Sequence, residues 1–191
     1  LRLSHFRSHK ALSLEADARP VALYGANGAG KTNILEAISL LSPGRGLRRA
    51  AAEELIRRPE AIGWKITALA DAGAIHAIIT AVTTPGQRRR GEVDGKAASQ
   101  SALGEITPMV WLTPQMDRLW TEGAAERRRF LDRATLSFEP GHGDRTLAYE
   151  KAMRERNRLL KEGGADPGWL TALEAQMAKA GAVLARARAE T

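Results

Sequence analysis

Alternating apolar and polar residues dominate the first part of the chain and predict β-strands. Residues 1–6 and 12–14 alternate between apolar and polar side chains, and further strands are expected over residues 64–69, 75–82 and 88–93. Such a period of two is typical of strands with one buried and one exposed face. The turn sequence Asp71-Ala72-Gly73 separates the two longest runs and predicts a hairpin, and Asp94-Gly95 predicts a second turn after the last run.

Two continuous apolar runs, Val21–Tyr24 and Val110–Leu112, predict short buried strands. The first run is followed by a glycine-rich loop and then by apolar residues at helical spacing, which are Ile34, Leu35, Ile38 and Leu41. The dipeptide Pro43-Gly44 ends this pattern, so a helix is expected before it. The order strand, glycine-rich loop and helix is the setting in which phosphate-binding loops occur.

Helical periodicity replaces alternation after residue 122. We expect one helix beginning near Ala124, a second that contains Tyr149 and Met153, and a third after the glycine-rich break at 163–168. The apolar residues of the third helix are spaced three and four apart: Leu170, Leu173, Met177, Ala180, Leu184 and Ala187. This spacing fits either a coiled-coil seam or a helix that packs on its own domain. The sequence thus predicts an α/β lobe over residues 1–122 and a helical lobe over residues 123–191.

The glycine-rich loop matches the phosphate-binding pattern G-x-x-x-x-G-K-[ST]. The nine residues expected to surround the nucleotide are Gly25, Ala26, Asn27, Gly28, Ala29, Gly30, Lys31, Thr32 and Asn33. Glycines let successive backbone N–H groups converge on phosphate oxygens, and the following helix directs its positive end toward them. Lys31 supplies a catalytic positive charge to the outer phosphates, and the Thr32 hydroxyl is placed to bind Mg²⁺. An ordinary glycine-rich turn is the alternative, which the strand–loop–helix setting disfavours.

The charge of the chain favours a polyanionic partner. The 191 residues carry a formal net charge of +7, and the sequence pI is about 10.2. The arginines gather in four groups: 45, 48, 49, 57 and 58; 88–90; 127–129; and 154, 156 and 158 with Lys161. Each group alone fits a solvated surface, but together with a nucleotide site they favour nucleic acid. The absence of cysteine and of a long apolar run indicates a soluble, cytoplasmic protein without a membrane partner.

The residues that hydrolyse a nucleotide are not evident. Phosphate-loop enzymes pair the loop with an apolar strand that ends in an acidic residue. The nearest match, Ala68–Asp71, continues into Ala72-Gly73 and is interpreted as a hairpin turn. The GTPase motif N-K-x-D is also absent. We therefore expect the chain to bind a nucleoside triphosphate with little hydrolysis.

Several motifs together resemble the RecF family, whose ATPase heads are similar to SMC-type and ABC-type heads. They keep the family's order along the chain: Phe6-Arg7-Ser8-His9; Gly28–Asn33 running into Leu35-Glu36-Ala37-Ile38; Leu41–Gly46; Arg127–Asp132, like R-R-x-F-L-D; and Arg156–Lys161, like R-N-x-L-L-K. The phosphate loop is shared widely, whereas the last two segments are narrower. The resemblance covers residues 1 to about 161. Because the chain starts at Leu1 and ends within a helical pattern, we expect it to be the N-terminal portion of a longer protein.

The resemblance implies a phosphate-loop NTPase head that binds ATP and Mg²⁺ and acts in DNA repair, replication and recombination. It implies an ATP-dependent homodimer that binds DNA at gaps or single-strand/double-strand junctions and helps to load the recombinase, with RecR and indirectly RecO and RecA as partners. The signature motif and the acidic strand would lie beyond Thr191. Gln115 replaces the family's usual glutamate and is either a Mg²⁺ ligand or a polar loop residue. Arg48 either reaches the nucleotide or the partner head, or is a surface arginine.

Two other functions remain possible from the sequence. The seam of the last helix would fit another SMC-type head, whose coiled coil would continue beyond Thr191. A small-molecule kinase with Arg88–Arg90 at its acceptor site is the third possibility, although no lid or acceptor motif supports it.

Overall fold

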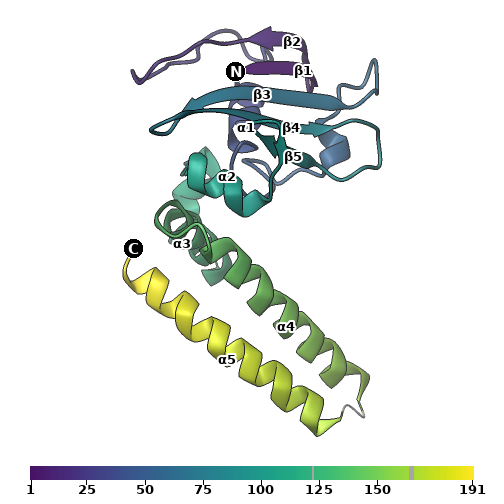
Figure 1. Ribbon diagram of the computed structural model, residues 1–191, viewed down its shortest axis with the longest axis vertical. Helices are drawn as coiled ribbons and strands as arrows, with labels where there is room; N and C mark the ends of the chain where they lie inside the picture. The colour runs from purple at the N-terminus through teal and green to yellow at the C-terminus, as the bar shows by residue number, and fades with distance from the viewer. Residues whose placement is uncertain (122, 164–165) are drawn as a thin grey trace. The chain divides into compact units, whose positions relative to one another are not determined.

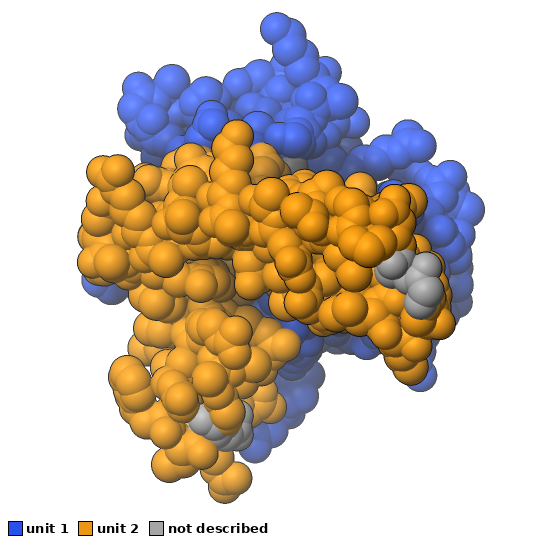
Figure 2. Space-filling view, turned by 90° about the horizontal axis from the view of Figure 1, so that it is seen from below, with its two compact units in different colours: residues 1–109 blue, residues 110–191 orange. Residues whose placement is uncertain are grey.

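The computed structural model describes residues 1–121, 123–163 and 166–191 (Figure 1). The chain divides into two compact units, Leu1–Met109 and Val110–Thr191, shown in blue and orange in Figure 2. The boundary predicted from the sequence falls at Glu122, which lies outside the described residues. It therefore stays a prediction.

The first unit is built on an antiparallel sheet of six strands in the order β2-β1-β3-β4-β5-β6 (Figure 1). Its strands are β1 (Arg2–Phe6), β2 (His9–Ser13), β3 (Trp64–Asp71), β4 (Ile75–Val82), β5 (Arg90–Val93) and β6 (Lys96–Ala97). The expected hairpin is confirmed, because β3 and β4 pair along their whole length from Trp64↔Val82 to Asp71↔Ile75. Asp71 itself is the last residue of β3 and pairs with Ile75, so the turn begins directly after it.

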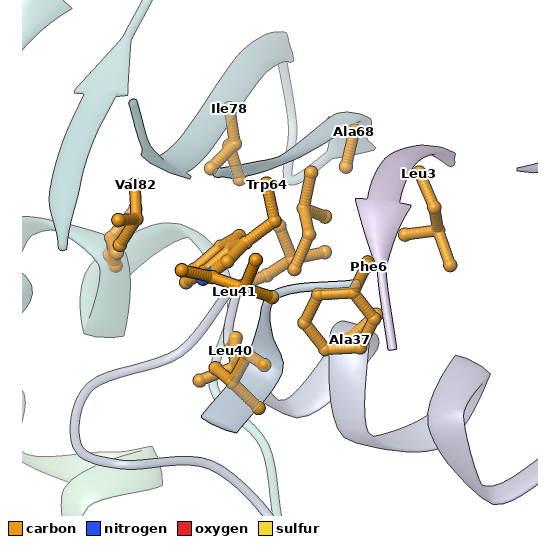
Figure 3. Packing of buried hydrophobic residues seen from close by; sticks show 13 residues of the cluster. Leu3, Phe6, Ala37, Leu40, Leu41, Trp64, Ala68, Ile78 and Val82 are labelled. Carbon is orange, nitrogen blue, oxygen red and sulfur yellow. The ribbon is translucent and has the colours of Figure 1, made fainter. Parts of the chain in front are cut away.

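The core of this unit lies between one face of the sheet and helix α1 (Lys31–Ser39) (Figure 3). Phe6 and Trp64 meet edge to face, with ring centroids 5.6 Å apart and planes at 82°. The Trp64 indole N–H also donates to the carbonyl of Ala52 at 2.9 Å, so the buried ring leaves no polar atom unsatisfied. Ala37 of α1 is completely buried in the same cluster and fixes the helix to the sheet.

The two short apolar runs do not form strands, so this part of the sequence prediction is wrong. Residues 21–24 and 110–112 have no regular secondary structure, and Tyr24 and Leu112 are 94% and 76% exposed. A strand needs a neighbour that takes its backbone hydrogen bonds. In the described part of the chain the strands pair among themselves and leave none for these runs. Short helices went unpredicted: η1 (Ala52–Leu55), α2 (Gln100–Ile106) and η2 (Pro114–Arg118).

The second unit consists mainly of the three expected helices, α3 (Ala124–Phe138), α4 (His142–Glu162) and α5 (Pro167–Ala189). Helix α5 runs beside α4 (Figure 1) and also contacts α3. Every residue of the predicted seam is at least half-buried, and Leu184 and Ala187 are buried. The seam is therefore occupied by helices of this chain.

A partly buried polar cluster joins the three helices. Asp132 of α3 accepts hydrogen bonds from the ring Nε2 of His142 at 2.7 Å and from the Nε of Arg188 at 2.7 Å. His142 is only 1% exposed, so its ring depends on this carboxylate for polar contact. The same carboxylate raises the pKa of the Arg188 guanidinium. Asp132, which ends the R-R-x-F-L-D segment, is thus a structural residue of this unit. No helix among the described residues is both long and apolar enough to cross a membrane.

Candidate nucleotide-binding site

The glycine-rich loop between β2 and α1 has the backbone geometry that a phosphate-binding loop needs. Gly25, Gly28 and Gly30 have φ angles of 143°, 84° and 89°, which residues with a side chain rarely adopt. The amine of Lys31 lies against this loop and donates to the carbonyls of Gly25 and Ala26, both at 2.7 Å. The loop thus curves around the ammonium group that is expected to bind phosphate.

Helix α1 begins directly after the loop. Gly30 adopts the left-handed conformation at the N-cap, and its carbonyl accepts the N–H groups of Asn33 at 2.9 Å and Ile34 at 3.2 Å. The preceding N–H groups, at Lys31 and Thr32, belong to the first turn, where a helix offers its amides and the positive end of its dipole to anions. Thr32 is exposed, so its hydroxyl is accessible at the mouth of the loop.

The turn between β1 and β2 braces the loop from one side, a feature that the sequence did not reveal. The ring Nε2 of His9 lies 3.2 Å from the carbonyl oxygen of Gly30. The side-chain amide of Asn33 donates to the Ser8 hydroxyl at 2.8 Å, and Arg57 donates to the Ser8 carbonyl at 2.7 Å. The first hairpin therefore holds the start of α1 in place.

Replacing Gly30 with Ala is expected to distort the loop. A Cβ atom at Gly30 would lie 2.6 Å from the His9 ring and 2.8 Å from the Ser8 hydroxyl, and the φ angle of +89° is itself strained for alanine. We expect ATP binding to weaken by at least tenfold, measured by isothermal titration calorimetry. Gly73→Ala is the matched control, since that glycine has a similar φ of +86° and open space around it. Equal effects of the two substitutions on ATP binding would contradict the expectation.

A buried carboxylate in α1, the helix that follows the loop, binds two arginines. Glu36 is 1% exposed and accepts two hydrogen bonds from Arg7, at 2.8 and 3.0 Å. Arg48 donates to the same carboxylate at 3.0 Å and to the side-chain oxygen of Asn33 at 2.9 Å. A buried carboxylate is stable only when it is paired in this way. The cluster connects α1, the first hairpin and the basic loop 44–49 to the residue that follows Thr32.

The structure assigns different surroundings to the other candidate residues. Arg48 binds Glu36 and Asn33, and its side chain is 42% exposed. Gln115 is an exposed residue of η2 in the second unit, and its role as a Mg²⁺ ligand stays a prediction. Arg89 is half-buried, and burial lowers the pKa of its guanidinium because the charged form loses hydration.

The last of the four arginine groups is largely neutralised by ion pairs. In the last group, Arg158 binds both Glu155 and Glu162, at 2.6 and 2.8 Å, and these carboxylates raise the pKa of its guanidinium. Arg154 and Arg156 in the same group are also ion-paired, with Glu150 and Glu174 respectively. Much of the positive charge of this group is therefore balanced on the two helices themselves.

Comparisons with known proteins agree with this site. A family model of the AAA domain matches residues 1–58, which contain the loop and α1. Over its whole length the chain is 47% identical to the DNA replication and repair proteins RecF of Rhizobium meliloti (strain 1021) and of Rhizobium leguminosarum bv. trifolii (strain WSM2304), and it covers 52% of each. The chain thus spans about half the length of the curated relatives it matches.

Two solved structures resemble the fold described above. The structure of the recombination mediator protein RecF-ATPrS in the RecFOR pathway superposes with a TM-score of 0.88 at 27% identity. It matches 99% of this chain and 52% of that one. The corresponding RecF-ATP structure gives a TM-score of 0.84, also at 27% identity, with the same coverage of both chains. The resemblance to RecF and the ATPase-head fold inferred from the sequence are therefore confirmed.

Proposed function

We propose that this chain, which is similar along its whole length to about half of a RecF protein, is the ATP-binding portion of a DNA repair and recombination mediator. The phosphate loop carries the proposal, because its geometry and the start of α1 suit a nucleoside triphosphate. The RecF relatives support ATP as the nucleotide and DNA repair and recombination as the process. These relatives also favour this function over a small-molecule kinase.

The loop amides, Lys31 and Thr32 would each contribute differently to ATP binding. The loop amides and the N-terminus of α1 would surround the β- and γ-phosphates, and Lys31 would add a mobile positive charge. The exposed Thr32 hydroxyl would bind Mg²⁺, which prefers oxygen ligands and commonly bridges to substrate phosphates. Gln115 is a candidate second oxygen ligand. When bound, Mg²⁺ would offset part of the phosphate charge.

ATP would act as a switch for dimerisation. The described residues supply a phosphate loop, whereas the sequence lacks an acidic strand that could direct hydrolysis. We infer that a second molecule completes the site and that the nucleotide bridges the two. The ATP-bound dimer would bind DNA at gaps or junctions, act with RecR and indirectly with RecO and RecA, and reside in the cytoplasm.

The test is whether ATP·Mg²⁺ drives both dimerisation and DNA binding. We expect mass photometry to show a dimer with ATP·Mg²⁺ and a monomer without nucleotide. In fluorescence anisotropy, the dimer should bind gapped duplex DNA with an affinity that falls steeply between 50 and 200 mM salt, about tenfold or more if several phosphates are contacted. A mass that does not respond to ATP would refute the switch. DNA binding that is insensitive to salt would refute mainly phosphate contacts.

A further inference from the structure

We call the face of the β-sheet that points away from the hydrophobic core the outer face. The residues of β3 alternate between the core and the surface, so that Trp64, Ile66 and Ala68 are buried while Lys65 and Leu69 are exposed. No residue of the outer face belongs to the hydrophobic core described above. This face therefore plays no part in holding α1.

The strand register places two positive side chains in one row across this face. Lys65 lies opposite Ser4 of β1 on one side and Ala81 of β4 on the other, and Ala81 lies opposite Arg90 of β5. Opposed residues of neighbouring strands point to the same face of a sheet. Because strands are spaced by about 4.8 Å, the backbones at Lys65 and Arg90 are about 10 Å apart.

The adjacent row adds a third positive charge and two hydroxyls. Arg2 lies opposite Ser13 of β2 and Thr67 of β3, and Thr67 is followed across the sheet by Ile79 and Glu92. Arg2 and Lys65 are diagonal neighbours, a separation of about 7–8 Å. Glu92 is the carboxylate of this row and lies three strands away from Arg2. The β1–β3 side of the face is thus positive and rich in hydroxyl groups.

The same side of the sheet is slightly hollowed. A shallow depression of about 480 Å³ is lined by residues of β1, β2 and β3, among them Arg2, Ser4, Ser13, Lys65 and Thr67. Among the residues that the structure describes, no salt bridge involves Arg2, Lys65 or Arg90. These cations differ in this respect from the ion-paired arginines of α4.

We propose that this basic outer face, defined by Arg2, Ser4, Ser13, Lys65, Thr67 and Arg90, binds the sugar-phosphate backbone of duplex DNA. The inference rests on the proposed function and specifies where the DNA lies. Exposed cations and hydroxyls are the groups that contact phosphates without reading sequence. Binding of single strands relies instead on aromatic side chains that stack on the bases, and the two rows contain none. The exposed apolar residues Leu69 and Ile75 lie outside these rows, toward the turn that joins β3 and β4.

Charge reversal at two positions of the face tests the proposal. The variant Arg2→Glu/Lys65→Glu is compared with Arg154→Glu/Lys161→Glu, which changes the net charge equally on exposed residues of α4. With ATP·Mg²⁺ present, we expect the sheet-face variant to bind duplex DNA at least tenfold more weakly in fluorescence anisotropy. The slope of log K against log salt should fall by about two, one for each lost phosphate contact, whereas the α4 variant should stay within about threefold of the unchanged protein.

The outcomes separate this inference from the proposed function. Both variants should still bind ATP and dimerise, since neither pair lies in the phosphate loop, and thermal unfolding should confirm that both are folded. Unchanged duplex binding by the sheet-face variant, or an equal loss in the α4 variant, overturns the inference alone. Loss of binding to single strands but not to duplex overturns it as well. An unchanged protein that does not bind duplex DNA at all overturns both the inference and the proposed function.

Discussion

Replacing Lys31 with Met is expected to abolish ATP-dependent dimerisation while leaving the chain folded. The Lys31 amine makes two hydrogen bonds to carbonyls of its own loop, both at an exposed site, so its loss costs little stability. With ATP bound, the same ammonium would bond phosphate oxygens. Hydrogen bonds to charged groups contribute about 1.5–3 kcal/mol each, so losing two weakens ATP binding by about 100-fold or more.

The measurement needs three readouts on the same protein. Isothermal titration calorimetry follows ATP affinity, mass photometry follows the dimer, and circular dichroism checks the fold. Lys10→Met is the matched control, because Lys10 is an exposed lysine of β2. Its substitution is the same chemical change at a position outside the loop. A Lys31→Met protein that still dimerises with ATP would rule out the nucleotide switch. A loss of dimerisation in the control as well would show that the effect is not specific to the loop.

The parts of the fold that the sequence predicted are those whose pattern is set by one buried face. The alternation in Trp64–Leu69 follows directly from packing Trp64 and Ile66 into the core, and the turn after Asp71 needs only local chemistry. The prediction of a strand at Val21–Tyr24 is wrong for the opposite reason. Its apolar composition suits a strand, but a strand also depends on a distant partner that periodicity does not identify.

The sequence predicted the phosphate-binding loop of the candidate site but not the residues that hold this loop in place. The loop motif specifies glycines, Lys31 and Thr32 because each acts on the phosphate directly. The brace from His9 depends on how β1 and β2 fold back, which no local pattern encodes. Glu36 offered a signal that could have been used. It lies between Ile34 and Ala37 on the buried face of α1, and a charge at such a position needs a partner of opposite charge.

Glu36→Ala is therefore expected to have the largest effect on stability of any change near the loop. It leaves the guanidinium groups of Arg7 and Arg48 without their shared acceptor and opens space in a buried site. Removing one partner of a buried ion pair costs about 3–5 kcal/mol. Because the side chains of Arg7 and Arg48 are 22% and 42% exposed and can turn toward water, we expect about 3 kcal/mol.

Urea denaturation measures this loss, with the exposed Glu92→Ala as a control that should change the free energy of unfolding by less than about 0.5 kcal/mol. Glu36→Gln distinguishes charge from shape. It keeps one oxygen acceptor, so it should fall between the unchanged protein and Glu36→Ala. Losing Glu36 also removes one of the two acceptors that hold Arg48 beside Asn33, the residue after Thr32, so ATP affinity should fall even where the protein stays folded. If Glu36→Ala were as stable as Glu92→Ala, the cluster would not be the support on which the start of α1 depends.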